Sequence, residues 1–399
     1  MPNFSTVRLV ALALALLLTG AAPPAPVPPA PSSASAGVAV AVSSEGGHLF
    51  AEVRLDGSGP LRFAVDTSGG EIVDQAVAER LGLRLGRRVN LGGVGGHSEV
   101  ARRLTIERVE VGGARLDKVR FLALPIGQSF GVAEGSRVDG IIGPALLARF
   151  TVTIDAAGGT MALAPRASGA LGDLPLALDG AGHPSSPCTV AALPAHCQLD
   201  TGSRIAVSLM RPFLDAHPAL AARATTAEGV QGYGIGGPAR GKLGPVEVSL
   251  GGRAVSVIGD FTTQRRGAFA DGSVDANLGE PLLRRFVVTY DLARGRARIV
   301  PSAAFDEPQV LDRSGLFLIR PDAGTTTVLD VRPGTPAASA GVRANDALVA
   351  LDGTPAAALS LDDIRARLAE RGGTRVVLRL RGAEGERDVT LTLANYASA

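Results

Sequence analysis

Apolar and polar residues alternate along many short segments of the chain, as they do in half-buried β-strands. Glycine pairs or turns rich in Gly and Pro separate neighbouring segments, which is typical of hairpins. The predicted strands are His48–Leu55, Leu61–Asp66, Leu104–Val111, Val119–Leu124, Pro245–Leu250 and Val255–Ile258. The pattern therefore predicts a mainly β fold.

Helical periodicity is confined to a few short stretches. Val73–Leu81 and Val207–His217 have the spacing of short helices. Pro144–Phe150 and Pro281–Phe286 each begin with a proline, which suits the first turn of a helix. Four short helices are therefore predicted among the strands.

The N-terminal segment indicates export. Leu9–Leu18 is an unbroken apolar run, which fits the core of a signal peptide better than a membrane span. Residues 22–37 are rich in Pro, Ala and Ser and are expected to form an extended linker. We predict a signal peptide at 1–21, no stable membrane anchor after its cleavage, and a periplasmic or secreted location.

Composition and charge exclude some classes of function. The chain has 40 Lys and Arg against 38 Asp and Glu, a formal net charge of +2. Because no basic excess is present to neutralise many phosphates, nucleic-acid binding is not expected. The five His residues are scattered and the two Cys residues match no zinc pattern, so no metal is expected. In an oxidising compartment Cys188 and Cys197 should form a disulfide rather than remain free thiols.

The middle of the chain contains two copies of one unit. Leu146–Asp155 reappears as Leu282–Asp291, 136 residues later, and Asp139–Gly143 has a counterpart at the same spacing. Small differences in spacing elsewhere indicate loop insertions. We predict a first lobe at 38–166 and a second at 167–302.

Each copy carries an Asp-Thr motif after a predicted strand. The motifs are Asp66-Thr67-Ser68-Gly69 and Asp200-Thr201-Gly202-Ser203. Two such motifs, placed alike inside a repeat, resemble the pepsin/retropepsin-like aspartic proteases over about residues 38–302. The resemblance implies a bilobal double β-barrel in which each lobe supplies one catalytic aspartate. The residues implied are Asp66 and Asp200 as the catalytic pair, Thr67 and Thr201 as supports, and Gly69 and Gly202 as turn residues.

The resemblance also implies a glycine-rich flap that folds over the substrate. Either 92–96, with Gly95 and Gly96, or 233–237, with Tyr233 and Gly236, could supply it. The expected chemistry needs no cofactor: two carboxyl groups a few Å apart share one proton, because both cannot ionise readily. The ionised group activates a water molecule and the protonated group polarises the peptide carbonyl.

Ser68 departs from the family pattern, which has Gly at this position. One hypothesis is that Gly69 and Gly70 take over the turn and the site is active. The other is that the first lobe is strained and the protein binds peptides without cutting them well. A trypsin-like serine protease does not fit, because only His48 lies upstream of the Ser68 loop.

The C-terminal segment 303–396 departs from the repeat and resembles a PDZ domain. Gly315-Leu316-Phe317-Leu318 matches the peptide-binding loop, and a helix is predicted from Ser360, with Asp363 completing a near capping box. Val376–Leu380 and Val389–Leu393 are predicted to be its closing strands. The resemblance implies that an extended peptide adds to a sheet edge, its terminal carboxylate held by backbone N–H groups of the loop. The other possibility is a domain that only packs on the protease as a stabilising lid.

The sequence as a whole predicts an exported aspartic-type endopeptidase with a small α+β PDZ domain at its C-terminus. Its partners would be peptide or protein substrates and a C-terminal peptide ligand at the PDZ domain. The alternative is a non-catalytic periplasmic peptide-binding or adaptor protein on a degenerate protease scaffold.

Overall fold

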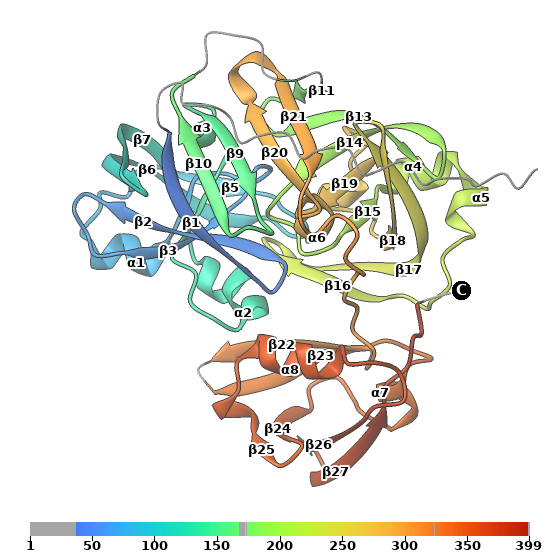
Figure 1. Cartoon of the computed structure of the whole chain (residues 1–399). Coiled ribbons are helices and arrows are strands. Elements are labelled where there is room, and N and C mark those ends of the chain that lie inside the picture. The colour runs from blue at the N-terminus through green and yellow to red at the C-terminus, as the bar shows by residue number, and fades with distance from the viewer. Residues whose placement is uncertain (1–36, 167–171, 173, 323, 398–399) are drawn as a thin grey trace, which may run out of the picture. The chain divides into compact units, whose positions relative to one another are not determined.

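The computed structural model describes residues 37–166, 172, 174–322 and 324–397. The predicted signal peptide and nearly all of the predicted linker lie outside these residues. The chain from Gly37 onward forms one compact unit (Figure 1). No helix in the described ranges is long and apolar enough to cross a membrane.

The first copy of the repeat folds into strands joined by short helices. Its elements are β1 (Val38–Glu45), β2 (His48–Leu55), β3 (Leu61–Val65), β4 (Ile72–Asp74), α1 (Gln75–Arg80), β5 (Arg88–Leu91), β6 (Glu99–Val111), β7 (Ala114–Leu124), the 3-10 turn η1 (Ile126–Gln128), α2 (Phe130–Glu134), β8 (Gly140–Ile142), α3 (Pro144–Leu147), β9 (Thr151–Asp155) and β10 (Thr160–Ala164).

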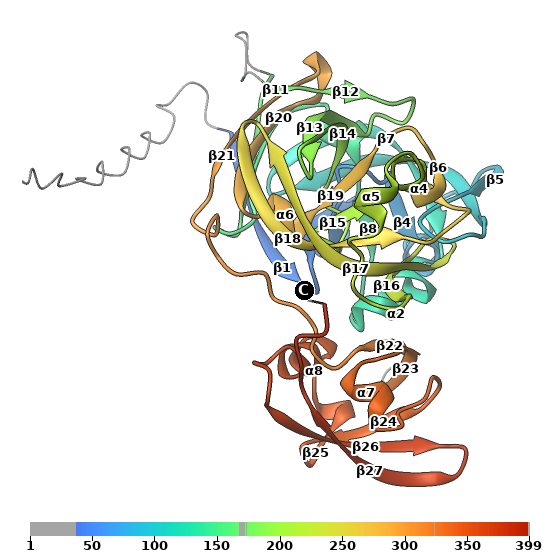
Figure 2. The same cartoon turned by 90° about the vertical axis from the view of Figure 1, so that its right-hand side faces the viewer.

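The second copy repeats the order of the main strands and helices, and its strands β17 and β18 are seen along their length in Figure 2. Its elements are β11 (Leu174–Pro175), β12 (Ala177–Leu178), β13 (Pro184–Val190), β14 (Leu193–Asp200), β15 (Val207–Leu209), α4 (Arg211–Ala216), α5 (Pro218–Ala221), β16 (Gly229–Gly234), β17 (Gly237–Leu250), β18 (Arg253–Thr262), η2 (Ala268–Ala270), β19 (Ala276–Gly279), α6 (Glu280–Leu283), β20 (Phe286–Asp291), η3 (Leu292–Arg294) and β21 (Arg296–Pro301).

The C-terminal segment has its own sheet, in the order β22-β23-β24-β26-β27, and its own apolar core. Its elements are β22 (Leu316–Asp322), β23 (Thr325–Val331), α7 (Pro336–Ser339), β24 (Ala347–Leu351), β25 (Thr354–Pro355), η4 (Ala356–Ala358), α8 (Leu361–Leu368), β26 (Arg375–Gly382) and β27 (Gly385–Thr392). The predicted cap is present, because Ser360 and Asp363 form a full capping box at the start of α8.

The two lobes use the same strand arrangement. In the first, β3 pairs in parallel with β8, and in the second, β14 pairs in parallel with β19. Additional pairings, β2 with β6 and β13 with β17, close each lobe's sheet on itself. The structure therefore confirms the predicted mainly β, bilobal fold.

The pairing of β9 with β20 joins the two lobes into one sheet. Thr153 and Thr289, which are equivalent residues of the repeat, lie directly opposite each other, and their hydroxyl oxygens are 2.9 Å apart. Equivalent residues can pair in this way only where a pseudo-twofold axis passes between them. The repeat seen in the sequence is therefore a structural symmetry.

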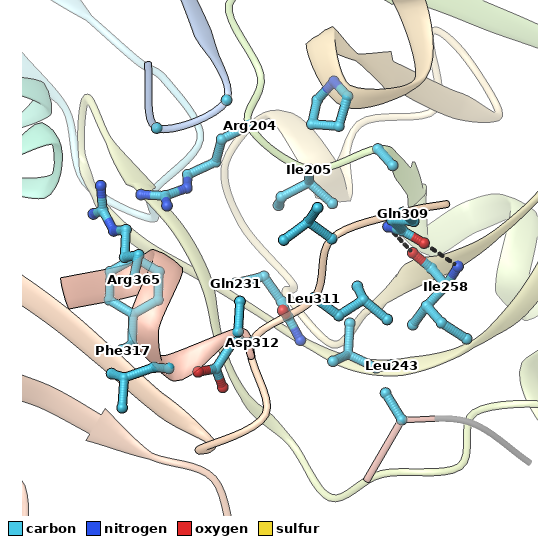
Figure 3. A pocket seen from close by; sticks show the side chains of 18 of the residues that line it. Arg204, Ile205, Gln231, Leu243, Ile258, Gln309, Leu311, Asp312, Phe317 and Arg365 are labelled. Carbon is cyan, nitrogen blue, oxygen red and sulfur yellow. Dashed lines mark hydrogen bonds between the residues drawn. The ribbon is translucent and has the colours of Figure 1, made fainter. Parts of the chain in front are cut away.

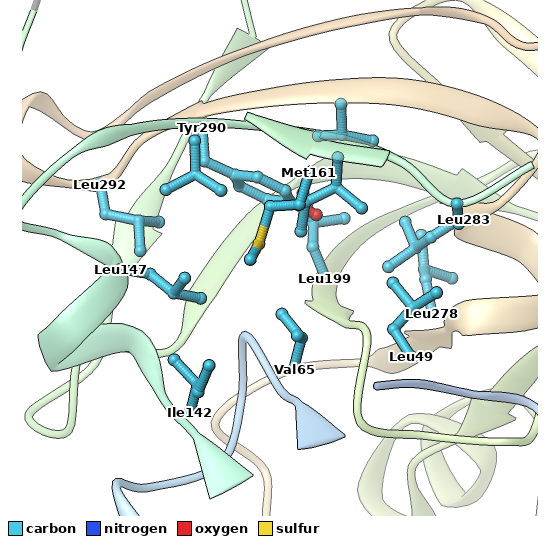
Figure 4. Close-up of a cluster of buried hydrophobic side chains, with 14 of the residues drawn as sticks. Leu49, Val65, Ile142, Leu147, Met161, Leu199, Leu278, Leu283, Tyr290 and Leu292 are labelled. Atoms are coloured by element: carbon cyan, nitrogen blue, oxygen red, sulfur yellow. The ribbon is translucent and has the colours of Figure 1, made fainter. Parts of the chain in front are cut away.

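A single apolar cluster spans both lobes and underlies the loops after β3 and β14. Figure 4 shows its centre, where Val65, Ile142 and Met161 of the first lobe face Leu199, Leu278 and Tyr290 of the second. Burial of such side chains stabilises each by about 1.5–3 kcal/mol. The two loops therefore rest on one rigid apolar base.

Two predicted helices begin later than expected. Val73–Leu81 and Val207–His217 each start with a short buried strand, β4 and β15, and the helix follows. In the first lobe Asp74 caps α1, its side chain accepting from the backbone N of Ala76 at 2.9 Å. The apolar residues at the start of each stretch, Val73 in the first and Val207 and Leu209 in the second, were assigned to a helical face, but they are buried strand residues.

Cys188 and Cys197 form the predicted disulfide, with their Cα atoms 5.9 Å apart, between the two strands of the β13–β14 hairpin. Replacing both by alanine should lower the free energy of unfolding by about 2–3 kcal/mol, because the closed loop of about ten residues restricts the unfolded chain. Denaturant unfolding of the oxidised protein, the reduced protein and the double variant measures this. Equal midpoints for all three would contradict it.

Candidate active site

Asp66 and Asp200 occupy equivalent places at the ends of β3 and β14. The backbone N of Asp66 donates to Ile142 O of β8 at 3.0 Å, and Asp200 pairs with Gly279 of β19. Both side chains are half-buried. The parallel strand pairs therefore present one carboxyl group from each lobe at the lobe junction.

Thr67 and Thr201 bind the two aspartate loops to each other. The backbone N of each donates to the hydroxyl oxygen of the other at 3.0 Å. The Thr67 hydroxyl donates to Leu199 O at 2.7 Å and the Thr201 hydroxyl to Val65 O at 2.8 Å. This reciprocal network is a second place where equivalent residues meet across the pseudo-twofold axis.

Ser68 fits its position without backbone strain. It is not among the non-glycine residues with positive φ, so the structure shows no left-handed backbone strain at this position. Its backbone N donates to Asp66 Oδ1 at 2.8 Å, as that of Gly202 donates to Asp200 Oδ1 at 2.9 Å. Its hydroxyl donates across the lobes to Leu199 O at 3.1 Å.

The two threonines should matter more for stability than Ser68. Thr67→Val leaves the buried N–H of Thr201 without an acceptor and should cost about 2–3 kcal/mol, whereas Ser68→Ala should cost about 1 kcal/mol or less. The difference arises because Leu199 O keeps the Thr67 hydroxyl as a donor when Ser68 is truncated. Denaturant unfolding of both variants checks this, and equal losses would count against the network described here.

Gly202 and Gly69 allow the backbone to approach the carboxyl group of Asp66. A Cβ at either position would overlap that carboxyl group. Because Gly202 lies two residues after Asp200, its contact with Asp66 places the two aspartate loops against each other. The structure thus brings Asp66, Asp200, Thr67, Thr201, Gly69 and Gly202 into one site.

The two carboxyl groups differ in their electrostatic surroundings. Burial, followed by the negative charge of Asp200, holds the pKa of Asp66 well above its ordinary value. Burial also raises the pKa of Asp200, but the Asn277 side-chain amide, which donates to Asp200 Oδ2 at 2.8 Å, opposes the rise. The stronger rise therefore falls on Asp66, while the Asn277 amide favours the ionised form of Asp200.

Asn277 is a site residue that the sequence analysis did not select. Its side chain is 1% exposed and lies on β19, where the first lobe has the apolar Ile141 at the equivalent position. The signal was present in the sequence, because an amide interrupts an apolar segment at this position only in the second copy.

Both glycine-rich hairpin tips are present, and they contact each other. The N of Gly95, in the loop between β5 and β6, donates to Ile235 O at 3.0 Å, and the N of His97 donates to Gly236 O at 3.3 Å. A Cβ on Gly95 would overlap the backbone of Gly236. Gly96 is exposed next to this contact, and Tyr233 pairs with Pro238 inside the β16–β17 hairpin. The structure therefore brings the two candidate flap segments, one from each lobe, against each other.

Gly315 directly precedes β22, and Leu316, Phe317 and Leu318 are its first residues. β22 is an edge strand of its sheet and contacts α8. Two amides of this loop are already used. The N of Gly315 donates to Asp312 Oδ2 at 2.6 Å, and the N of Leu316 donates to Ser314 Oγ at 3.1 Å. The Tyr396 hydroxyl donates to the same oxygen of Asp312 at 2.9 Å. A terminal carboxylate could therefore bind these two amides only by displacing side chains of the protein.

A cavity of about 640 Å³ lies between this edge strand and the second lobe (Figure 3). Arg204 and Ile205, which directly follow the Asp200 motif, line it together with Gln231 of β16. Phe317 of β22 and Arg365 of α8 line the other side. The C-terminal domain therefore meets the second lobe next to its aspartate loop.

Two family models match parts of this chain. Residues 51–145 match the family model of aspartyl proteases, and residues 327–382 match that of PDZ domains. No curated protein matches the chain by sequence. Among solved structures, the crystal structure of basic 7S globulin from soybean is similar at 13% identity and a TM-score of 0.39, over 69% of this chain and 98% of that one. The chain thus contains an aspartyl protease domain and a C-terminal PDZ domain.

Proposed function

We propose that the protein is an aspartic-type endopeptidase in which Asp66 and Asp200 share one proton and activate a water molecule. One observation carries this proposal: two half-buried carboxyl groups with raised pKa values lie on loops that Thr67 and Thr201 bind to each other. A structural ion pair would need an opposite charge, whereas here two carboxyl groups lie together at the lobe junction.

The different surroundings of the two aspartates assign their roles. The water oxygen attacks the peptide carbonyl carbon while ionised Asp200 takes a proton from the water. Protonated Asp66 donates a hydrogen bond to the carbonyl oxygen. The tetrahedral intermediate then collapses, the C–N bond breaks, and the proton held by Asp200 passes to the leaving nitrogen. The two flap tips would close over an extended peptide and exclude bulk water from this step.

We also propose the domain organisation that the sequence predicts: a signal peptide at 1–21, a linker at 22–37, lobes at 38–166 and 167–302, and a PDZ domain at 303–396. Export to the periplasm or outside the cell agrees with the disulfide between Cys188 and Cys197. Gly315–Leu318 would then bind an extended peptide at the edge of β22.

Cleavage of an unstructured protein substrate between pH 3 and pH 8 tests the activity. We expect a bell-shaped pH profile with an acidic-to-neutral optimum, because activity requires one proton on the pair. A peptide with a secondary alcohol in place of the scissile carbonyl, which mimics the tetrahedral intermediate, should inhibit more tightly than the substrate binds. Saturable peptide binding without cleavage at any pH would instead favour the adaptor alternative.

Asn277→Ile gives the second lobe the residue of the first and should shift the pH profile. Loss of the amide donor raises the pKa of Asp200, so the acidic limb of kcat/KM should move to higher pH by about one unit. The alkaline limb, which reports the proton on Asp66, should move much less. An acidic limb that stays in place would show that the amide does not stabilise the ionised Asp200.

A further inference from the structure

The two ends of the pseudo-symmetric site are not alike. Arg204 lies four residues after Asp200, and Gly70, without a side chain, lies four residues after Asp66. At the Gly70 end the nearby polar group is His183, whose ring nitrogen is 3.2 Å from Gly69 O and whose other nitrogen is bound to Asp179. The repeat therefore places a guanidinium group at one end of the site only.

The Arg204 side chain is only 18% exposed, yet its guanidinium makes few interactions with the protein. Its buried Nη1 has no hydrogen-bond partner among the described residues. The nearest carboxylate oxygen, Glu134 Oε1, is 3.9 Å from Arg204 Nη1. The same oxygen lies closer to His48 Nδ1, at 3.0 Å. A guanidinium carries five N–H donors in a planar fork, and leaving them unpaired away from water is costly.

A second guanidinium lies beside the first. Arg365 of α8 is bound to Asp362, at 3.1 Å, and to Ala133 O. Burial, and then the positive charge of Arg204, lowers the pKa of Arg365 to about 10. Figure 3 shows both side chains reaching into the same part of the cavity near the Phe317 ring, whose centre is 5.8 Å from the Arg204 guanidinium carbon.

We propose, on the basis of the proposed function, that Arg204 and Arg365 form a subsite for a carboxylate of the peptide substrate. A carboxylate matches the planar fork of a guanidinium and would satisfy the buried Nη1 of Arg204, which has no hydrogen-bond partner among the described residues. It would also reduce the repulsion between the two cations. The loop amides of Gly315 and Leu316 cannot serve this purpose as they stand, because Asp312 and Ser314 already accept from them.

The position of the cavity fixes which peptides reach this subsite. Arg204 directly continues the Asp200 motif, while Phe317 lies on β22 and Arg365 on α8 of the PDZ domain. A peptide that extends from the aspartate pair toward the PDZ domain therefore passes Arg204. The carboxylate can be an Asp or Glu side chain near the cleaved bond or the free C-terminus of the substrate.

Matched peptides test the subsite and separate these two sources. One series replaces each position around the cleaved bond by Glu or by Gln, and a second carries a free or an amidated C-terminus. We expect one carboxylate to raise kcat/KM by about tenfold or more over its neutral match, as hydrogen bonds to charged groups do. The series in which the preference occurs identifies the source.

Variants then assign the preference to Arg204. Arg204→Gln should reduce the ratio of kcat/KM values for acidic and neutral peptides to less than about twofold, Arg204→Lys should retain part of it, and Arg298→Gln, an exposed arginine on β21, should leave it unchanged. An unchanged ratio in Arg204→Gln, or no preference for a carboxylate at any position, would overturn the subsite.

A binding measurement separates this inference from the proposed activity. Fluorescence anisotropy of labelled peptides with the Asp200→Asn protein should show the same preference for the carboxylate, and Arg204→Gln in that background should remove it. Equal binding of acidic and neutral peptides would overturn the subsite even if the wild type cleaves. Absence of cleavage by the wild type, with the binding preference intact, would overturn the proposed activity alone.

Discussion

Asp200→Asn should lower kcat for peptide cleavage by roughly 10³-fold or more, because an amide cannot take the proton from the attacking water. The fold should be preserved. Gly202 N can still donate to the side-chain oxygen, as it does to Asp200 Oδ1 at 2.9 Å. Asn277 can turn its amide so that its Oδ1, which has no partner among the described residues, accepts from the new amide.

Steady-state kinetics together with thermal unfolding measure this prediction. Asp117→Asn, at an exposed position on β7, is the matched control and should leave both quantities unchanged. If Asp200→Asn cleaved peptides as fast as the wild type, Asp200 would not be part of the catalytic pair. If its melting temperature fell sharply, the loss of activity would have to be measured again in a variant that folds.

Asp260 should make the protein less stable as the pH rises. This carboxyl group on β18 is 0% exposed, and neither of its oxygens has a hydrogen-bond partner among the described residues. Burial raises its pKa to about 8, although the positive charge of Arg332 opposes the rise. Asp260 is therefore neutral in the folded protein at pH values where it is ionised in the unfolded chain.

The sign of the effect follows from proton linkage. Between about pH 4 and pH 8 the folded state holds a proton at Asp260 that the unfolded state has released, so stability falls as the pH rises. At 1.36 kcal/mol per pKa unit, the loss in the free energy of unfolding reaches about 5 kcal/mol near pH 8. Asp260→Asn, which resembles the neutral carboxyl group, should remove this part of the pH dependence.

Denaturant unfolding at pH 5 and at pH 8 tests the prediction. The wild type should lose more stability between these values than Asp260→Asn does, with Asp117→Asn behaving like the wild type. Other buried carboxyl groups, such as Glu280 and Asp312, also have raised pKa values, so the difference between variants is the informative quantity. Equal losses in the wild type and in Asp260→Asn would contradict the raised pKa of Asp260.

Internal repetition explains why much of the site could be predicted from the sequence. Once Asp66 and Asp200 occupy equivalent places in two copies, a pseudo-twofold axis must bring Thr67 and Thr201 together, and the structure places them in reciprocal hydrogen bonds. The alternating pattern likewise located the strands that position them. These features depend on local sequence and symmetry alone.

The features that were missed depend on contacts between distant segments. In the sequence, Asn277 is one residue of a buried strand. Only the pairing of β19 with β14 places its side-chain amide against Asp200. Ser68 suggested strain by comparison with glycine, but its hydroxyl finds Leu199 O in the other lobe. The contact between the two glycine-rich hairpin tips and the contact of Asp312 with Gly315 also depend on tertiary structure. No periodicity or spacing in the sequence reports such contacts.

Mass spectrometry of a peptide library incubated at pH 4–7 tests the central claim most directly. Wild type, Asp66→Asn and Asp200→Asn should be compared at equal concentration, each shown to be folded. We predict new peptide termini with the wild type, and none above background with either variant. Absence of cleavage by the folded wild type, or equal cleavage by the wild type and both variants, would contradict the claim that Asp66 and Asp200 form a catalytic pair.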